Sequence, residues 1–161
     1  MRGSEAVVAL LRDVGVEVIF GLCGDTSLPF YEALATSNHG IRHVLTRDER
    51  SASFMADAYA RLSGRVGVCE GPSGGGATYI LPGLAEANAS SVPLVCLTSD
   101  IARQDAGRGT LTELNQTRLF EPVTRSSTLP TSARELVAAI GAAFRDALRC
   151  GAEVYSSLKS I

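Results

Sequence analysis

Short apolar runs alternate with amphipathic segments along most of this chain. Strands that alternate with helices are typical of βαβ units, whose sheets are mainly parallel. Strands as apolar as these suit a sheet that is covered on both faces. The sequence therefore predicts an α/β fold in three layers, with helices on both faces of a mainly parallel sheet of about six strands. The expected strands are residues 16–20, 41–45, 65–70, 93–98, 123–129 and 154–158, and the expected helices are residues 4–14, 29–35, 49–62, 77–89, 115–120 and 131–149.

Length and composition restrict the class of protein. A chain of 161 residues with 45% apolar side chains can form one domain with a core. Its net charge of −2 gives no electrostatic basis for binding nucleic acid or a membrane, and no apolar run could span a bilayer. Glu5 and Asp13 interrupt any signal peptide, so we expect a cytoplasmic protein. Neither His39 nor His43 lies near a cysteine and no C-x-x-C pair exists, so we predict no metal site and expect both histidines at the surface.

Glu49 stands where the expected strand 41–45 gives way to a helix. In open α/β sheets, ligands bind at the carboxyl ends of the strands, which makes Glu49 a candidate site residue. The alternative is that it complements the helix dipole or pairs with Arg47 or Arg50. The helix also carries an apolar stripe at helical spacing, formed by Phe54, Met55, Ala58, Tyr59 and Leu62.

A glycine-rich loop, GPSGGGATY at residues 71–79, joins an expected strand to an expected helix. Such loops often bind phosphate through the free N–H groups of the helix N-terminus. However, the Gly-Lys-Ser/Thr of a P-loop is missing, and the third glycine of a dinucleotide-binding motif would fall at Tyr79. The other explanation is that the glycines let the backbone pass close to something bulky.

The run 47–95 contains, in order, the patterns R-x-E, A-D-x-Y-A-R, G-x-V-G-V-C, S-G-x-G-A-T and S-V-P. In this order they resemble the pyrimidine-binding (Pyr) domain of thiamine diphosphate enzymes, and most of all the acetolactate synthase, oxidase and decarboxylase group. A looser resemblance runs from Gly3 to about Leu148. It implies the Pyr-domain fold over residues 3–150, with residues 151–161 as a departing tail or the start of a linker.

The resemblance also implies a function for Glu49. In this family a glutamate at that position hydrogen-bonds N1′ of the cofactor's aminopyrimidine, favours its imino tautomer and so promotes the ylide that attacks a 2-oxo acid. The same likeness assigns cofactor binding to the loop after the first strand and to the glycine-rich loop; simple turn chemistry is the alternative for the first loop. The implied cofactor-binding residues are Glu49, Gly24, Asp25, Thr26, Pro72, Ser73, Gly74 and Gly75.

Two departures from the family pattern in the glycine-rich loop leave the exact substrate open, and one further along the chain argues against a standard acetolactate synthase. The family's glycine-rich loop is commonly S-G-P-G-A-T-N, whereas this chain has Gly75 for the proline and Tyr79 for the asparagine. Acetolactate synthases often carry a Phe-Gln pair further on, where this chain has Leu111-Thr112.

Complete enzymes of this kind hold the diphosphate through Mg²⁺ on a second α/β domain, with a G-D-G motif and a later asparagine. Gly24-Asp25-Thr26 is not that motif. We therefore expect the central and diphosphate-binding domains to be absent, the isolated chain to be inactive, and the cofactor's diphosphate and Mg²⁺ to be held elsewhere. A flavin can belong to the full enzyme. The expected partners are a second copy through the Pyr domain, a diphosphate-binding domain or subunit, and a small 2-oxo acid.

Other functions stay open at this point. The chain could be the alpha subunit of a split sulfopyruvate- or phosphonopyruvate-type decarboxylase, or a non-catalytic lone Pyr domain that serves as an interaction module. A flavodoxin-like nucleotide binder is a third alternative.

Overall fold

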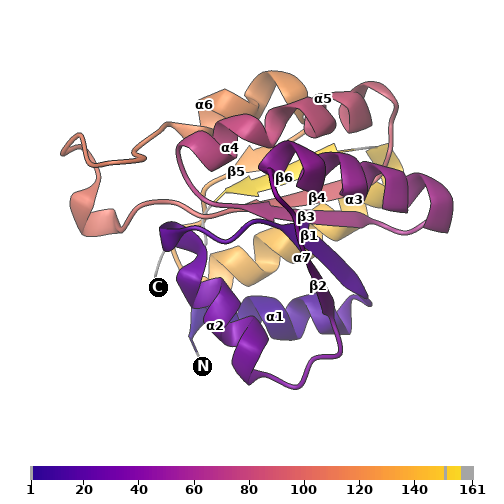
Figure 1. The fold of residues 1–161 in the computed structure, drawn as a ribbon, viewed down its shortest axis with the longest axis horizontal. Coiled ribbons are helices and arrows are strands. Elements are labelled where there is room, and N and C mark those ends of the chain that lie inside the picture. Colours follow the sequence, from indigo (N-terminus) through magenta and orange to yellow (C-terminus); the bar gives the residue numbers. More distant parts are fainter. Residues whose placement is uncertain (1, 151, 157–161) are drawn as a thin grey trace.

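The computed structural model describes residues 2–150 and 152–156. Six parallel strands form one sheet in the order β2-β1-β3-β4-β6-β5, which confirms the predicted α/β fold (Figure 1). The strands are β1 (Val18–Gly21), β2 (Arg42–Leu45), β3 (Gly67–Gly71), β4 (Leu94–Thr98), β5 (Ser127–Thr128) and β6 (Ala152–Ser156). The helices are α1 (Gly3–Asp13), α2 (Leu28–Thr36), α3 (Glu49–Ser63), α4 (Gly75–Tyr79), α5 (Leu81–Ala89), α6 (Gln116–Phe120) and α7 (Ala133–Cys150).

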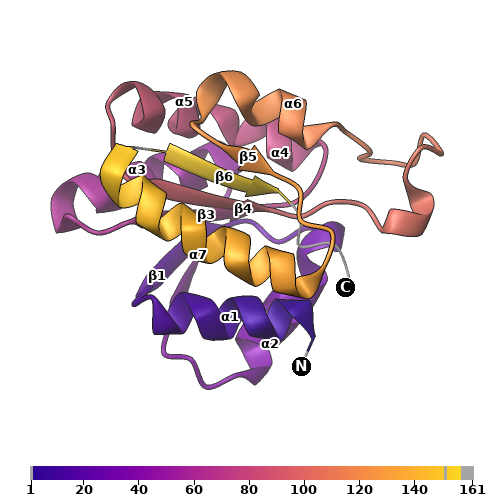
Figure 2. The same cartoon turned by 180° about the vertical axis from the view of Figure 1, so that it is seen from behind.

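Helices cover both faces of the sheet. Helices α1, α2 and α7 lie on one face, and α3, α4, α5 and α6 lie on the other (Figures 1 and 2). Because successive side chains of a strand point to opposite faces, β4 supplies both cores. Val95 and Leu97 pack with α1 and α7, while Leu94 and Cys96 pack with α3 and α5.

Three expected elements differ from the structure. The last strand, expected at residues 154–158, is β6 at Ala152–Ser156, and residues 157 and 158 lie outside the described residues. The strand predicted over 123–129 is reduced to Ser127–Thr128, because residues 121–123 form a 3₁₀ turn and the hydroxyl of Thr124 donates to the carbonyl of Phe120 at 2.9 Å. The helix predicted over 77–89 is divided at Ile80 into α4 and α5, with Pro82 at the start of α5, where a missing N–H does no harm.

The apolar stripe of α3 does not form the packed side of that helix. Phe54 is 46% exposed, Met55 38% and Leu62 90%. The buried side carries small residues instead, because β3 and α5 approach closely: a Cβ atom on Gly67 would lie 2.2 Å from the carbonyl oxygen of Ala56. Where a strand and a helix approach this closely, the side chains between them must be small.

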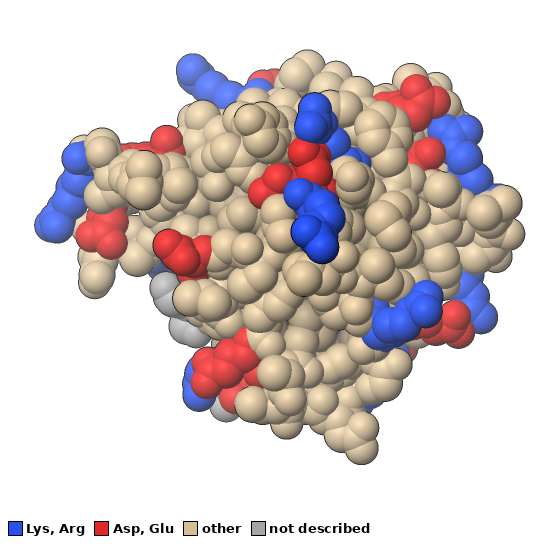
Figure 3. All heavy atoms as spheres, in the orientation of Figure 1, with Lys and Arg blue, Asp and Glu red and all other residues tan. Residues whose placement is uncertain are grey.

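Charges are dispersed on the face shown in Figure 3. Basic and acidic side chains lie there in small mixed groups separated by uncharged surface. A continuous basic patch, the usual footprint of nucleic-acid binding, is not seen on this face. Among the described residues, no helix combines the length and the apolar character that crossing a membrane requires.

Two glycine-to-alanine changes should have opposite effects on stability. Gly64 ends α3 at φ +69°, a left-handed conformation, so we expect Gly64→Ala to lower the free energy of unfolding by about 1 kcal/mol. Gly141 lies inside α7, where a Cβ atom would meet only Arg145 at 3.7 Å, so Gly141→Ala should raise it by roughly 0.5–1 kcal/mol. Urea unfolding measures both, and effects of the same sign would contradict the prediction.

Candidate functional site

Helix α3 begins at Glu49, directly after Asp48 caps its N-terminus. The carboxylate of Asp48 accepts a hydrogen bond from the backbone N–H of Arg50 at 2.8 Å and binds the guanidinium of Arg50 at 2.7 and 2.9 Å. The hydrogen bonds from Arg50 hold the pKa of Asp48 at about 2. Arg50 is thus bound to Asp48 and not, as one sequence alternative had it, to Glu49.

The side chain of Glu49 turns inward and is only 9% exposed. A Cβ atom on Gly76 would lie 3.0 Å from its Oε1, and one on Gly71 would lie 3.6 Å from its Cγ. The carboxyl group therefore lies against bare backbone, between the carboxyl end of β3 and helix α4.

The two loops predicted to bind the cofactor meet beside this carboxyl group. They follow β1 and β3, which are neighbours in the sheet. The backbone N–H of Ser73 donates to Oγ1 of Thr26 at 3.0 Å, and Gly24 lies directly against the ring of Pro72. Parallel strands place the loops that follow them at one edge of the sheet. Glu49 follows β2 and therefore lies at the same edge.

A third segment, around Thr112, closes the other side of the loops. The hydroxyl of Ser73 donates to Oγ1 of Thr112 at 2.7 Å, and a Cβ atom on Gly74, at φ +64°, would lie 2.7 Å from the Cβ of Thr112. Thr112 itself has φ +68°, which is rare for a β-branched residue and is found mainly where the surroundings impose it. Leu111-Thr112, noted above as a departure from the family pattern, thus lies at the site.

These segments surround a hollow of about 550 Å³. Gly74 does not line the hollow itself but packs against Thr112, which does. Glu49 likewise packs against Gly76, another lining residue. The lining residues include Gly24, Asp25, Thr26, Pro72, Ser73, Gly75, Gly76 and Thr112. The structure thus gathers all the predicted site residues in one region.

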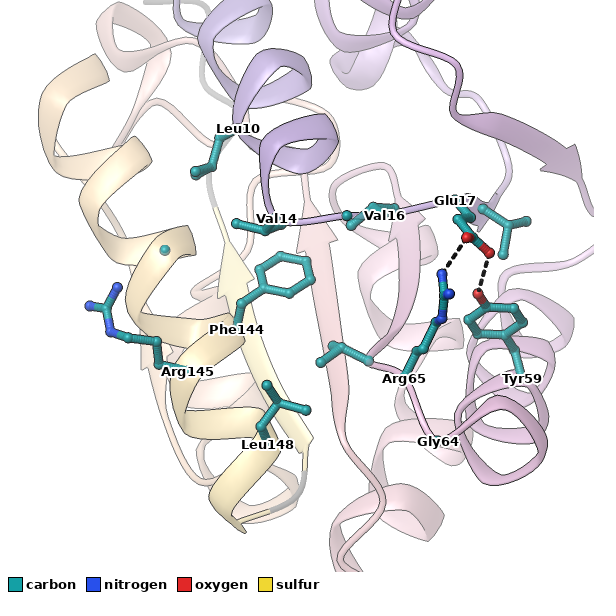
Figure 4. Close-up of a pocket in the computed structure, with 14 residues that line it drawn as sticks. Leu10, Val14, Val16, Glu17, Tyr59, Gly64, Arg65, Phe144, Arg145 and Leu148 are labelled. Carbon is teal, nitrogen blue, oxygen red and sulfur yellow. Dashed lines mark hydrogen bonds and ion pairs between the residues drawn. The ribbon is translucent and has the colours of Figure 1, made fainter.

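A larger hollow, of about 670 Å³, lies at the opposite edge of the sheet (Figure 4). Its walls come from α1, α7 and the amino ends of β1 and β3, and side chains such as Phe144 and Leu148 make it mainly apolar. Glu17 pairs there with Arg65. Since Glu49 is at the carboxyl edge, this hollow is separate from the candidate site.

Sequence reasoning missed another buried acid close to Glu49, namely Glu70 near the end of β3. It is fully buried, and the hydroxyl of Tyr31 donates to its Oε2 at 2.6 Å. Burial raises the pKa of Glu70 to about 8, while the hydrogen bond from Tyr31 and the nearby hydroxyl of Ser27 oppose the rise and the charge of Glu49 adds to it. The available signal was an acidic residue inside an otherwise apolar strand run.

The expectation that both histidines lie at the surface is wrong. His43 is half-buried, with Nε2 3.0 Å from the hydroxyl of Tyr31, and burial lowers its pKa. His39 is also partly buried: its Nδ1 accepts from the N–H of Ile41 at 2.9 Å, and its Nε2 lies 2.7 Å from the carbonyl of Leu34. Both imidazole rings therefore form hydrogen bonds within the folded protein and are not simply exposed to solvent.

Residues 1–119 match the family described as thiamine pyrophosphate enzyme, N-terminal TPP binding domain. The chain belongs to this family. The resemblance to the Pyr domain of thiamine pyrophosphate enzymes is thereby confirmed, and the flavodoxin-like alternative is wrong. Thiamine diphosphate is the cofactor of the family.

Relatives within the thiamine pyrophosphate enzymes include acetolactate synthases and their large subunits. The probable large subunit of Methanocaldococcus jannaschii is 39% identical over 144 residues, which are 89% of this chain and 24% of the relative. Isozyme 1 of Escherichia coli K12 is 34% identical over 143 residues, which are 89% of this chain and 25% of the relative. The acetolactate synthase of Mycobacterium bovis is 37% identical over 144 residues, which are 89% and 23% of the two chains. The chain therefore spans about a quarter of the length of these relatives.

Proposed function

We propose that this chain supplies the pyrimidine-binding half of a thiamine diphosphate site that acts on a small 2-oxo acid by decarboxylation or carboligation. The buried carboxyl group of Glu49 carries the proposal, because it lies at the carboxyl edge of the sheet beside both predicted loops. Membership of the family and likeness to acetolactate synthase large subunits support this class of reaction.

The surroundings of Glu49 fit a flat heteroaromatic ring with a basic nitrogen. Arg50 binds Asp48 and does not neutralise Glu49. The carboxyl group of Glu49 can therefore share a proton with a ligand. Gly71 and Gly76 present bare backbone to it, so a ring can approach closely. When bound, the cofactor supplies the electron sink of the reaction. Glu49 would hold and return one proton at the pyrimidine N1′ of the bound cofactor, as a general acid and base.

The two loops would line the cleft for cofactor and substrate. The residues proposed to do so are Gly24, Asp25, Thr26, Pro72, Ser73, Gly74 and Gly75. The hydrogen bonds of Ser73 to Thr26 and Thr112 tie both loops to the segment that follows β4. Such ties hold a binding surface in one geometry before the ligand arrives.

The rest of the active site would come from outside this Pyr domain. We place the Pyr domain at residues 3–150, and β6 continues its sheet to Ser156. The diphosphate and Mg²⁺, and a flavin where the enzyme has one, would be held by other domains or subunits. A second copy would pack against the exposed stripe of α3, since Phe54 and Met55 form apolar surface close to Glu49 along the helix.

A partner-dependent assay tests the proposal. We expect calorimetry to detect no binding of thiamine diphosphate with Mg²⁺ to the isolated chain at millimolar concentration. Adding a diphosphate-binding domain should produce CO₂ release from a 2-oxo acid. A panel of pyruvate, sulfopyruvate and phosphonopyruvate separates an acetolactate synthase-like enzyme from a split decarboxylase.

Two outcomes would contradict the proposal. Micromolar binding by the isolated chain would mean that it holds the diphosphate itself. No activity with any diphosphate-binding domain would favour the non-catalytic interaction module.

A further inference from the structure

Glu70 lies close to Glu49 but has no part in the function proposed above. The Cγ of Glu49 packs on Gly71, the residue that follows Glu70 in β3. On the other side, Oε2 of Glu70 lies so close to β1 that a Cβ atom on Gly21 would be 2.5 Å away. Two buried carboxyl groups therefore flank the carboxyl end of β3.

A chain of hydrogen bonds leads from Glu70 towards the edge of the sheet. The hydroxyl of Tyr31, on α2, lies 2.6 Å from Oε2 of Glu70 and 3.0 Å from Nε2 of His43, on the edge strand β2. The rings of Tyr31 and His43 meet edge to face at 4.9 Å. Tyr31 thus connects a fully buried carboxyl group to a half-buried imidazole.

This chain can hold its protons in two arrangements. When Glu70 is ionised, Tyr31 donates to Oε2 and His43 donates from Nε2 to the tyrosine oxygen. When Oε2 carries a proton, Glu70 donates to Tyr31 and Tyr31 donates to Nε2 of His43. The same three groups and distances serve both arrangements.

Glu70 is also incompletely satisfied as a carboxylate. Among the described residues, its buried Oε1 has no hydrogen-bond partner. A buried charge with a free lone pair is costly, so the protonated form is favoured. Five ionisable groups interact electrostatically or through hydrogen bonds with Glu70 or with the hydrogen-bonded series that starts at it. They are Glu49 of α3, Tyr31 of α2, His43 of β2, Cys23 after β1 and Cys96 of β4.

We propose that Glu70, Tyr31 and His43 are positioning residues that form a proton relay serving Glu49. The inference rests on the proposed function of Glu49. In the transfer, the bond from Glu70 Oε2 to its proton breaks as that proton joins the Tyr31 oxygen, and the original hydroxyl proton passes to Nε2 of His43. The products are a Glu70 carboxylate and a His43 imidazolium, and no other reactant is needed.

Through the relay, Glu70 would hold a proton while Glu49 is ionised and would lose it when Glu49 is protonated. Burial is the main reason that Glu70 keeps its proton, and the charge of Glu49, while it is ionised, adds to this effect. When Glu49 takes up a proton, Glu70 can release its own to His43, whose half-buried ring exchanges protons with solvent. The site would thereby keep its total charge without opening to water.

Titration of the full chain by NMR, with ¹³C-labelled glutamate and ¹⁵N-labelled histidine and without cofactor, tests the relay. We expect the carboxyl carbon of Glu70 to titrate near pH 8 and the nitrogens of His43 to show a step at the same pH. Tyr31→Phe should raise the Glu70 midpoint by about one pH unit, because the carboxylate loses its donor, and should remove the step from His43. Glu49→Gln should lower the midpoint by roughly half a unit or more.

The exposed Glu121→Gln is the matched control and should change neither titration. A Glu70 midpoint below pH 6, or titrations unchanged by Tyr31→Phe, would overturn the relay. A midpoint unchanged by Glu49→Gln would overturn its link to Glu49. None of these results depends on cofactor binding, so the relay and the proposed function can fail separately.

Discussion

Glu49→Gln is expected to lower turnover of the enzyme assembled with its diphosphate-binding domain by about 10²- to 10⁴-fold, the usual loss when a general acid–base group is removed. Glutamine has nearly the same shape and can occupy the space beside Gly71 and Gly76. It cannot hold and return a proton, so the loss should fall on turnover while the fold is kept.

Asp48→Asn offers a control of the same chemistry one residue earlier. Asparagine caps a helix about as well as aspartate. The carboxylate of Asp48 is paired with Arg50, so it is not expected to contact a ligand. Turnover of Asp48→Asn should therefore stay near that of the wild type. Steady-state rates of CO₂ release from the 2-oxo acid measure both variants. A Glu49→Gln enzyme with wild-type turnover would remove Glu49 from the chemistry.

Glu70→Gln should make the protein more stable at alkaline pH. Burial raises the pKa of Glu70 from an ordinary 4.5 to about 8 in the folded state. A raised pKa contributes stability that is fully present below pH 4.5 and is lost as the pH rises through 8. Glutamine cannot ionise, so at pH 9 the variant should exceed the wild type by on the order of 3 kcal/mol, and its midpoint of thermal unfolding by roughly 5–10 °C.

At pH 5 the two proteins should be nearly equally stable, because Glu70 is then protonated and donates to the Tyr31 oxygen, as the amide nitrogen of glutamine also can. Thermal unfolding followed by circular dichroism at pH 5, 7 and 9 measures the difference. The exposed Glu121→Gln should show no such trend. A stability difference that does not change with pH would mean that Glu70 is ionised throughout.

Local pattern was sufficient for the order of the elements and for the position of Glu49. Alternating apolar runs and helical spacing depend on neighbours in sequence, so the parallel α/β fold follows from them. The glycine-rich loop and the loop at Gly24 could likewise be located, because strand ends and turn residues are local features. The exception is the strand over 123–129, where Thr124 bonds the preceding turn and shortens the pairing.

Only the tertiary structure decided what each of these residues touches. The order β2-β1-β3 brings Tyr31 and His43 to Glu70, 39 and 27 positions away, and packing brings Thr112 to Ser73, also 39 positions away. The exposed stripe of α3 has the same origin, since contact with β3 admits only small side chains. The sequence by itself determined the fold and a candidate carboxylate, whereas burial and strand order, which set pKa values and hydrogen-bond partners, exist only once the sheet has formed.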